Sequence, residues 1–201
     1  MRFYFIRHGI TSHNERGIVQ SRSDIPLSDM GREQAALAGD RLKNEKISGF
    51  YASPLSRARE TAEIIAAPHN LPVTIDSSLL EIDAGDLEDK SYLDLIEFRK
   101  NKTVPFIDFT YPNGERIIDV FARAQNFLDH VLANHNINDT IAVVSHGAFL
   151  RAMFSHLLKV SLEEAYVLLP TMKNTAVSII DFNLNDTRII ELGSVTHLDT
   201  K

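Results

Sequence analysis

Short runs of consecutive apolar residues alternate along the chain with longer segments in which apolar residues recur every three or four positions. The runs at residues 3–6 and 140–144 have the unbroken apolar character of strands that are buried on both faces. Residues 49–52 and the weaker run at 72–75 extend this set of strands. Because helical segments separate these runs, the pattern predicts a mostly parallel sheet covered by helices.

Cap residues predict where two of the helices begin. Ser28 or Asp29 is expected to cap a helix that extends to about residue 45. The Ser53-Pro54 pair is expected to provide the N-cap and first position of a helix that ends near Pro68. Apolar residues at helical spacing predict two further helices, at residues 115–134 and 147–158.

Two final runs, at residues 175–182 and 187–192, are separated by turn-forming residues, which predicts an antiparallel hairpin. The fold expected from the whole pattern is a three-layer α/β/α sandwich around a mostly parallel sheet with an antiparallel C-terminal hairpin. The chain has no internal repeat, low-complexity tract or Gly/Ser linker, so a single domain over residues 1–201 is expected. A small lid segment is expected at about residues 81–115.

Composition narrows the classes of function. The absence of cysteine excludes a disulfide scaffold, a zinc ribbon and a thiol nucleophile. The 21 basic and 27 acidic residues give a formal charge of -6, which argues against nucleic acid or an anionic membrane as the main partner. Arg7 interrupts the N-terminal apolar run too early for a signal peptide or membrane helix, so a cytoplasmic protein is expected. A small basic pocket remains compatible with this overall charge.

Polar side chains follow three of the predicted strands. Arg7 and His8 come after the first strand, Arg57 and Arg59 lie a few residues after the second, and His146 follows the fourth. In an open α/β sheet ligands bind at the carboxyl ends of the strands, so these side chains are expected to converge if the strands are neighbours. Helix N-termini at the same edge add N–H groups that favour an anion. The sequence therefore predicts a phosphate pocket.

The chemistry of such a pocket follows from its residue types. A neutral imidazole can attack phosphorus and form a covalent intermediate. Nearby arginines are expected to keep the ring neutral by charge repulsion and to spread the charge of the transferring group, so no metal or other cofactor is expected. The leaving alkoxide needs a proton from a carboxylic acid. Periodicity does not select among the candidates, which are Glu81, Asp83, Asp86, Glu88 and Asp89.

Residues 7–14, with the sequence RHGITSHN, resemble the R-H-G-x-T-x-x-N signature of the histidine phosphatase superfamily, in its phosphoglycerate-mutase-like branch. The likeness continues in order and at family-like spacing to about residue 150. It is carried by Gln20, Asp24, Pro26, Leu27, Gly31, Gln34, Ala35, Ser53, Leu55, Arg57, Ala58, Thr61, Ala62, Leu80, Glu81, Gly85, Glu88, Pro112, Gly114, Glu115 and Ser145-His146-Gly147.

The resemblance implies that His8 is the nucleophile that becomes phosphohistidine. It implies that Arg7, Arg57 and His146 bind the phosphoryl oxygens. Glu81 would be the proton donor for the leaving group and then the general base for water. Further residues fall where family members contact substrate or phosphate, namely Asn14, Gln20, Ser21, Arg59 and Gly147.

Departures from the family pattern leave the substrate open. Ile10 stands where many relatives have a carboxylate, Ser21 and Asp89 where glycine is common, and Arg116 where a serine usually follows the Gly-Glu pair. The segment before that pair lacks the longer basic insert of bisphosphoglycerate-dependent mutases, which favours a phosphatase acting on a small phosphorylated metabolite. A mutase and a non-catalytic protein that binds a phosphorylated ligand stay as alternatives.

Some of these residues also have a purely structural interpretation. Arg59 is spaced to form a helix-face ion pair with Glu63. His130 and His135 are five residues apart on a predicted helix, which places them on different faces and argues against a metal pair. The sequence leaves the oligomeric state open, a homodimer included. Aromatic residues expected in the core or lid, some of them against the organic part of the substrate, are Tyr92, Phe98, Phe106, Phe109 and Tyr111.

Overall fold

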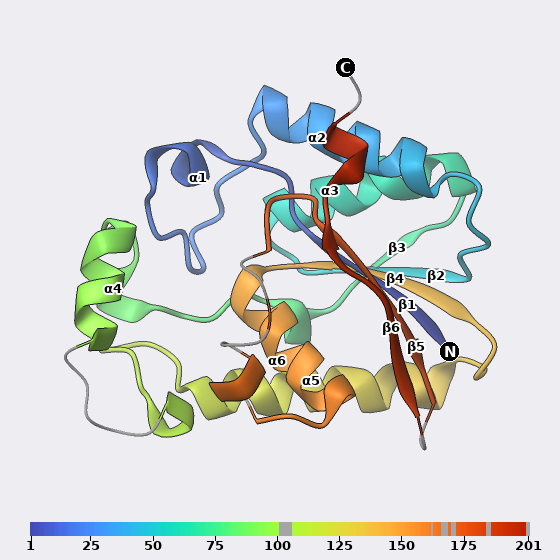
Figure 1. Ribbon diagram of the computed structural model, residues 1–201. Helices are drawn as coiled ribbons and strands as arrows, with labels where there is room; N and C mark the ends of the chain where they lie inside the picture. The colour runs from blue at the N-terminus through green and yellow to red at the C-terminus, as the bar shows by residue number, and fades with distance from the viewer. Residues whose placement is uncertain (101–105, 162, 166–168, 170–171, 184–185, 200–201) are drawn as a thin grey trace.

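The computed structural model describes residues 1–100, 106–161, 163–165, 169, 172–183 and 186–199. A six-stranded sheet lies at its centre (Figure 1). Its strands are β1 (Arg2–Arg7), β2 (Gly49–Ala52), β3 (Val73–Ile75), β4 (Thr140–Ser145), β5 (Val177–Phe182) and β6 (Thr187–Ser194). Their order across the sheet is β3-β2-β4-β1-β5-β6. Residues 101–105 of the expected lid and residues 184–185 of the expected turn lie outside the described part of the chain.

The strand directions confirm the mostly parallel sheet and its C-terminal hairpin. Strands β1, β4, β2 and β3 pair in parallel, whereas β5 runs antiparallel to β1 and β6 antiparallel to β5. Arg7 at the end of β1 lies opposite Ser145, and Val144 lies opposite Ala52 at the end of β2. The carboxyl ends of these three strands therefore meet at one edge of the sheet.

Helices cover both faces of the sheet, as expected for a three-layer α/β/α sandwich (Figure 1). Helices α2 (Asp29–Leu42) and α3 (Ser56–Ala66) lie on one face, and α5 (Ile117–Asn134) and α6 (Gly147–Leu158) lie on the other. Phe3 and Phe5 belong to the core on the α5/α6 side, whereas Tyr4 and Ile6 belong to the core on the α2/α3 side. Burial on both faces explains why β1 is an unbroken apolar run.

The remaining elements lie in the connections. Helices α1 (Ser12–Arg16) and α4 (Tyr92–Lys100), which the apolar pattern does not predict, lie to one side of the layers (Figure 1). No helix within the described residues is long and apolar enough to cross a membrane. Short 3₁₀ helices occur as η1 (Ala67–His69), η2 (Ser77–Leu79), η3 (Gly85–Leu87), η4 (Phe106–Asp108) and η5 (Thr196–Leu198).

Of the two helix starts that cap residues predict, one is confirmed. Ser28 caps α2 as expected, because its Oγ accepts a hydrogen bond from the backbone N of Gly31 at 3.2 Å. The prediction that Ser53-Pro54 begins the next helix is wrong, since α3 begins at Ser56. The Oγ of Ser53 instead lies 2.8 Å from Nε2 of His146, on the neighbouring strand's end.

Candidate active site

A cavity of about 390 Å³ lies at the carboxyl ends of β1, β2 and β4. Most of the residues that the sequence predicts for the site line it, namely Arg7, His8, Gln20, Ser21, Arg57, Glu81 and Gly147. Asn14, Arg59 and His146 are not among the residues described along its wall. No group of three or more His, Asp or Glu side chains in the described ranges is placed to hold a metal ion.

His8 lies on this wall, and His146 lies beside it. Their ring centroids are 5.1 Å apart, and the two side chains are almost completely buried. The backbone N of His8 donates to the carbonyl oxygen of Ser145 at 3.0 Å, so the pairing of β1 with β4 continues one residue past the strand ends. The sheet itself thus brings together two histidines that are distant in the sequence.

The hydrogen bonds and burial of His8 define which ring nitrogen can react. Nδ1 lies 2.8 Å from the carbonyl oxygen of Gly9, which can only accept, so Nδ1 carries the proton and Nε2 keeps its lone pair. Burial, and then the positive charges of Arg57 and Arg7, lower the pKa of His8 well below its ordinary value. The ring is therefore neutral at pH 7, with burial rather than the expected charge repulsion as the larger cause.

The His146 ring is also neutral, but its contacts differ from those of His8. Burial, followed by the charge of Arg57 and the proximity of His8, lowers the pKa of His146 well below its usual range. When the Oγ of Ser53 donates to Nε2, the ring proton is on Nδ1. Nδ1 is buried and has no hydrogen-bond partner among the described residues. His146 can therefore present an N–H donor to a ligand.

Two arginines add buried donors and positive charge. Arg57 donates from Nη1 to the Ser23 carbonyl at 2.7 Å and from Nη2 to the Ser21 carbonyl at 2.8 Å. Arg7 donates from Nη1 to the Met172 carbonyl at 2.6 Å. The Nε atoms of both arginines are buried without a partner in the described chain. Burial lowers the pKa of Arg57 to about 10, which leaves it cationic at neutral pH.

Glu81 is the candidate acid that lines the cavity. Its carboxylate lies at the N-terminus of α6, where Oε1 accepts from the backbone N of Ala148 at 3.1 Å and of Phe149 at 3.4 Å. The backbone N of Ile82 also donates to Oε1, at 2.9 Å. The other four candidate acids are absent from the described cavity wall. The geometry thus distinguishes Glu81 from its neighbours, which periodicity does not.

Glu88, another of the candidate acids, is held by hydrogen bonds outside the described cavity wall. Its carboxylate accepts from the backbone N of Arg22 at 2.8 Å, the backbone N of Ser23 at 3.1 Å and the hydroxyl of Ser23 at 2.7 Å. Although burial raises the pKa of Glu88, these hydrogen bonds outweigh it and lower the pKa. Glu88 therefore fixes the loop whose carbonyls bind Arg57.

The predicted substrate-binding residues separate into three placements. Gly147 and Gln20 line the cavity, and the Oε1 of Gln20 accepts from the hydroxyl of Thr11 at 2.8 Å, which leaves its amide nitrogen as a donor. Asn14 lies in the first turn of α1, where its Oδ1 accepts from the backbone N of Thr11 at 3.3 Å in a capping box. Arg59 lies on the exposed face of α3, with its Nε 3.9 Å from Oε1 of Glu63, as the structural interpretation expects.

Asn174 is a site residue that the sequence analysis missed. Its Nδ2 donates to the carbonyl oxygen of His8 at 3.0 Å and to Oδ1 of Asn14 at 3.1 Å. The residue lies just before β5, and because β5 is antiparallel to β1 its beginning lies at the carboxyl end of β1. The carboxyl-end rule points to residues that follow parallel strands, so it does not identify a residue that precedes an antiparallel strand.

Two departures from the family pattern occupy left-handed backbone positions, where glycine is the usual residue. Ser21 has φ of 48° and Asp89 has φ of 60°. The hydroxyl of Ser21 donates to the Ile82 carbonyl at 3.1 Å and accepts from the Ala84 N at 2.7 Å, contacts that a glycine cannot make. These bonds offset the backbone cost and connect the Gln20 loop to the segment that carries Glu81.

The outer wall of the cavity comes from α4 and the segment before α5. Tyr92, Leu95 and Ile96 line it together with Tyr111 and Arg99. Arg99 donates from Nε to the Tyr111 hydroxyl at 2.9 Å. Of the predicted aromatic residues, Tyr92 and Tyr111 are on this wall, and the side chain of Phe106 lies outside the described part. Packing partners of Tyr111 in the core are Phe98 and Phe109.

Comparisons with known proteins agree with this geometry. Residues 3–194 match the sequence profile of the histidine phosphatase superfamily, branch 1. The chain is 32% identical to phosphoglycerate mutase-like protein 4 of Arabidopsis thaliana, over 96% of this chain and 85% of that protein. It is 30% identical to phosphoserine phosphatase 1 of Hydrogenobacter thermophilus, over 98% and 94% of the two chains. Among solved structures, Bacillus stearothermophilus YhfR superimposes with a TM-score of 0.86, at 30% identity and 98% coverage of each chain.

Proposed function

The chain belongs to the histidine phosphatase superfamily (branch 1), and from this premise we propose that it hydrolyses small phosphomonoesters through a phosphohistidine intermediate on His8. One observation supports the proposal above the others. The neutral imidazole of His8 lies where three side chains, those of Arg7, Arg57 and His146, offer buried nitrogen donors that have no partner among the described residues. Such donors match the oxygens of a phosphoryl group.

In the first half-reaction the lone pair on Nε2 of His8 attacks phosphorus. The bond from phosphorus to the ester oxygen breaks, and its electron pair stays with the leaving oxygen. Glu81 donates a proton to that oxygen, so the product leaves as an alcohol. Donors on Arg7, Arg57 and His146 stabilise the charge on the three phosphoryl oxygens, and no metal ion is required for this step.

In the second half-reaction water replaces the imidazole. The Glu81 carboxylate takes a proton from the water molecule as its oxygen attacks phosphorus. The bond from phosphorus to Nε2 breaks, inorganic phosphate is released, and the electron pair returns to the ring. His8 and a protonated Glu81 are thereby restored for the next turnover.

The cavity also limits the substrate. A volume of about 390 Å³ suits a small metabolite, and the apolar side chains of Tyr92, Leu95 and Ile96 can contact its organic part. The relatives include a protein named phosphoserine phosphatase and one named phosphoglycerate mutase-like. A mutase would return the phosphoryl group to its product, release phosphate slowly and depend on a bisphosphate primer. Of these two activities, we propose the phosphatase.

The test is turnover of p-nitrophenyl phosphate by the wild type, by His8→Ala and by the control His130→Ala, whose ring is exposed on α5. His8→Ala should have no detectable turnover, and the control should match the wild type. A chelator should leave the turnover of the wild type and of the control unchanged. The wild type quenched in alkali should carry phosphate on His8. Unchanged turnover of His8→Ala would refute the proposal. Turnover that needs an added bisphosphate would replace it with the mutase.

A further inference from the structure

Glu81 lies in a segment without regular secondary structure, between η2 and η3. The two histidines follow strands of the sheet, whose backbone hydrogen bonds fix their positions. No strand or helix within the described residues includes residues 80–84. Peptide groups in such a segment must find other partners. The side chains that supply these partners therefore act together with the backbone N–H groups of α6 in placing the Glu81 carboxyl group.

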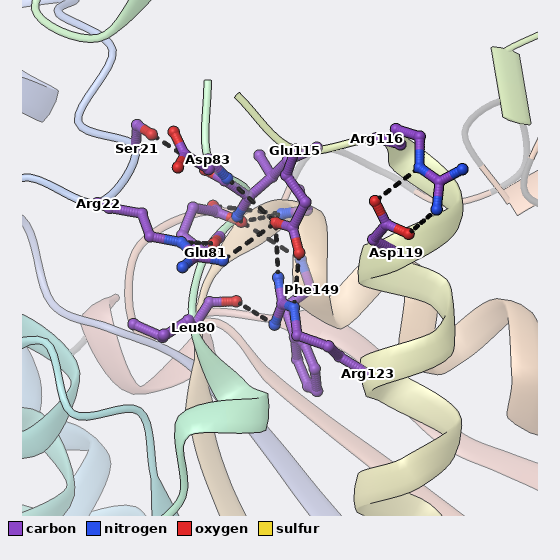
Figure 2. A network of polar contacts seen from close by, with 12 residues as sticks. Ser21, Arg22, Leu80, Glu81, Asp83, Glu115, Arg116, Asp119, Arg123 and Phe149 are labelled. Atoms are coloured by element: carbon purple, nitrogen blue, oxygen red, sulfur yellow. Dashed lines mark hydrogen bonds and ion pairs between the residues drawn. The ribbon is translucent and has the colours of Figure 1, made fainter. Parts of the chain in front are cut away.

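Arg123 reaches this segment from α5 (Figure 2). Its Nη1 donates to the carbonyl oxygens of Ser78 at 2.5 Å and Leu80 at 2.9 Å. The guanidinium carbon also lies 5.8 Å from the ring centroid of Phe149, and the backbone N of Phe149 donates to Glu81. Arg123 thus contacts the backbone just before Glu81 and the helical turn that binds the Glu81 carboxylate.

Glu115 links Arg123 to the other side of the segment. Both of its carboxylate oxygens accept from Arg123, at 2.8 Å and 3.0 Å, in a bidentate pair. Oε2 also accepts from the backbone N of Asp83 at 3.2 Å and from Nη2 of Arg22 at 3.2 Å. Arg22 in turn donates from Nε to the Glu81 carbonyl at 3.2 Å, so the network closes around Glu81 (Figure 2).

Close backbone contacts hold the network in place. The backbone N of Glu115 donates to the Asp83 carbonyl at 2.9 Å. A Cβ atom on Gly114 would lie 2.5 Å from that same carbonyl oxygen, so the two segments approach more closely than any other residue allows. The side chains of Glu115 and Arg123 are only 11% and 19% exposed. Removing Glu115 leaves the charge of Arg123 largely buried and without its ion-pair partner, whereas removing Arg123 leaves Glu115 paired only with Arg22.

We propose that Arg123 and Glu115, together with Arg22, are positioning residues that hold Glu81 against the leaving oxygen. None of the three is among the described residues that line the cavity, so they act through the placement of Glu81 and not by touching substrate. The inference rests on the proposed function, because it assigns these residues to the proton-donating step. It predicts an effect that depends on the leaving group.

The choice of leaving group distinguishes a displaced Glu81 from a general loss of active-site structure. An alkoxide needs a proton as it departs, whereas 2,4-dinitrophenolate is stable without one. The ratio kcat/KM reports transfer to His8, so a displaced Glu81 lowers it for an alkyl phosphate and leaves it nearly unchanged for 2,4-dinitrophenyl phosphate. General acid catalysis contributes about a hundredfold or more, and a displacement of about 1 Å can cost a similar factor.

The experiment measures kcat/KM with β-glycerol phosphate and with 2,4-dinitrophenyl phosphate. For Arg123→Met we expect a loss of about thirtyfold with the alkyl ester and less than about threefold with the dinitrophenyl ester. Arg123→Lys keeps the charge but not the planar fork, and should recover part of the loss. Glu115→Gln should lose activity in the same selective way. Arg22→Met removes the more exposed arginine and is the variant to use if Arg123→Met does not fold.

The matched control is Arg116→Met, which breaks an exposed ion pair with Asp119 next to the network (Figure 2). It should match the wild type with both substrates. Glu81→Gln provides the reference for a lost acid, and His8→Ala the blank. A selective loss for Glu81→Gln without one for Arg123→Met, Glu115→Gln or Arg22→Met overturns this inference alone. No selective loss for Glu81→Gln overturns the acid assignment as well, and turnover by His8→Ala overturns the proposed function itself.

Discussion

The two ends of the cavity are built in different ways. The phosphoryl end, formed by Arg7, His8, Arg57 and His146, is placed by strands β1 and β4 and by the first turns of α3 and α6. The acid end, formed by Glu81 and residues 80–84, is placed by side chains that reach it from three directions. One end depends on the backbone ladder of the sheet, and the other depends on a cluster of ion pairs.

This difference in support matches how precisely the reacting groups must be placed in the two parts of the proposed reaction, the attack on phosphorus and the protonation of the leaving oxygen. Phosphorus must approach one nitrogen atom along a fixed line, and β1 and β4, at the centre of the sheet, position side chains more precisely than a loop does. The acid must follow a leaving oxygen whose position depends on the substrate. A segment held by side chains can be adjusted by single substitutions without changing the sheet. Variants at the two ends should therefore have different signatures.

The largest effect is expected at the phosphoryl end. Arg57→Met removes a buried charge and donor, and we expect kcat/KM to fall about a thousandfold, by the same factor for alkyl and dinitrophenyl phosphates. The loss should not depend on the leaving group, because the proposed role of Arg57 is to bind the transferring phosphoryl group. Kinetics with both substrates, together with the inhibition constant for vanadate, measure it. A loss much greater for the alkyl ester would show that the two ends are not separate.

A smaller effect is expected from Ser53→Ala. The change leaves Nε2 of His146 without its 2.8 Å partner, so the ring no longer favours the proton on Nδ1. We expect kcat/KM to fall about tenfold with both substrates. This is about the value of one hydrogen bond to a charged group, here the bond from Nδ1 of His146 to a phosphoryl oxygen. Ser155→Ala is the matched control, because Ser155 is an equally buried serine that bonds the Val160 carbonyl outside the cavity. Equal activity of the two variants would remove Ser53 from the site.

The sequence predicts that His8 and His146 lie together because both follow buried strands. Apolar runs locate β1 and β4, and the carboxyl-end rule then places His8 and His146 together, which their centroid distance of 5.1 Å confirms. The prediction that Ser53 caps a helix is wrong because a serine before proline is a local signal, whereas the hydrogen bond of Ser53 to His146 spans 93 positions of sequence.

The acid end was predicted only through the family resemblance. The acidic residues after β3 have no periodicity that distinguishes Glu81 from Asp83 or Glu88. What distinguishes them is the N-terminus of α6 and the network from Arg123, both distant in the sequence. Long-range polar contacts of this kind leave no pattern in a single sequence, because an arginine on a helix is usually a solvated residue.

The smallest expected effect is on the free energy of unfolding. It also distinguishes the phosphoryl end from the acid end. Burial lowers the pKa of both His8 and His146, so each ring binds a proton in the unfolded chain below about pH 6.5 and stays neutral in the folded one. The unfolded state then holds more protons, and the free energy of unfolding falls as the pH is lowered through that value.

Each buried ring should contribute about 1 kcal/mol to the loss of stability between about pH 7 and about pH 5.5. Urea unfolding of wild type and His146→Asn at both pH values measures this contribution, and the variant should lose less stability than the wild type over the same interval. His130→Asn removes an exposed histidine instead and should retain the wild-type dependence. An identical dependence for His146→Asn and wild type would mean that this ring takes up a proton in the folded protein over the same pH range as in the unfolded chain. Burial would then not keep the His146 ring uncharged. The contrast between two uncharged rings at the phosphoryl end and the ion pairs at the acid end would fail.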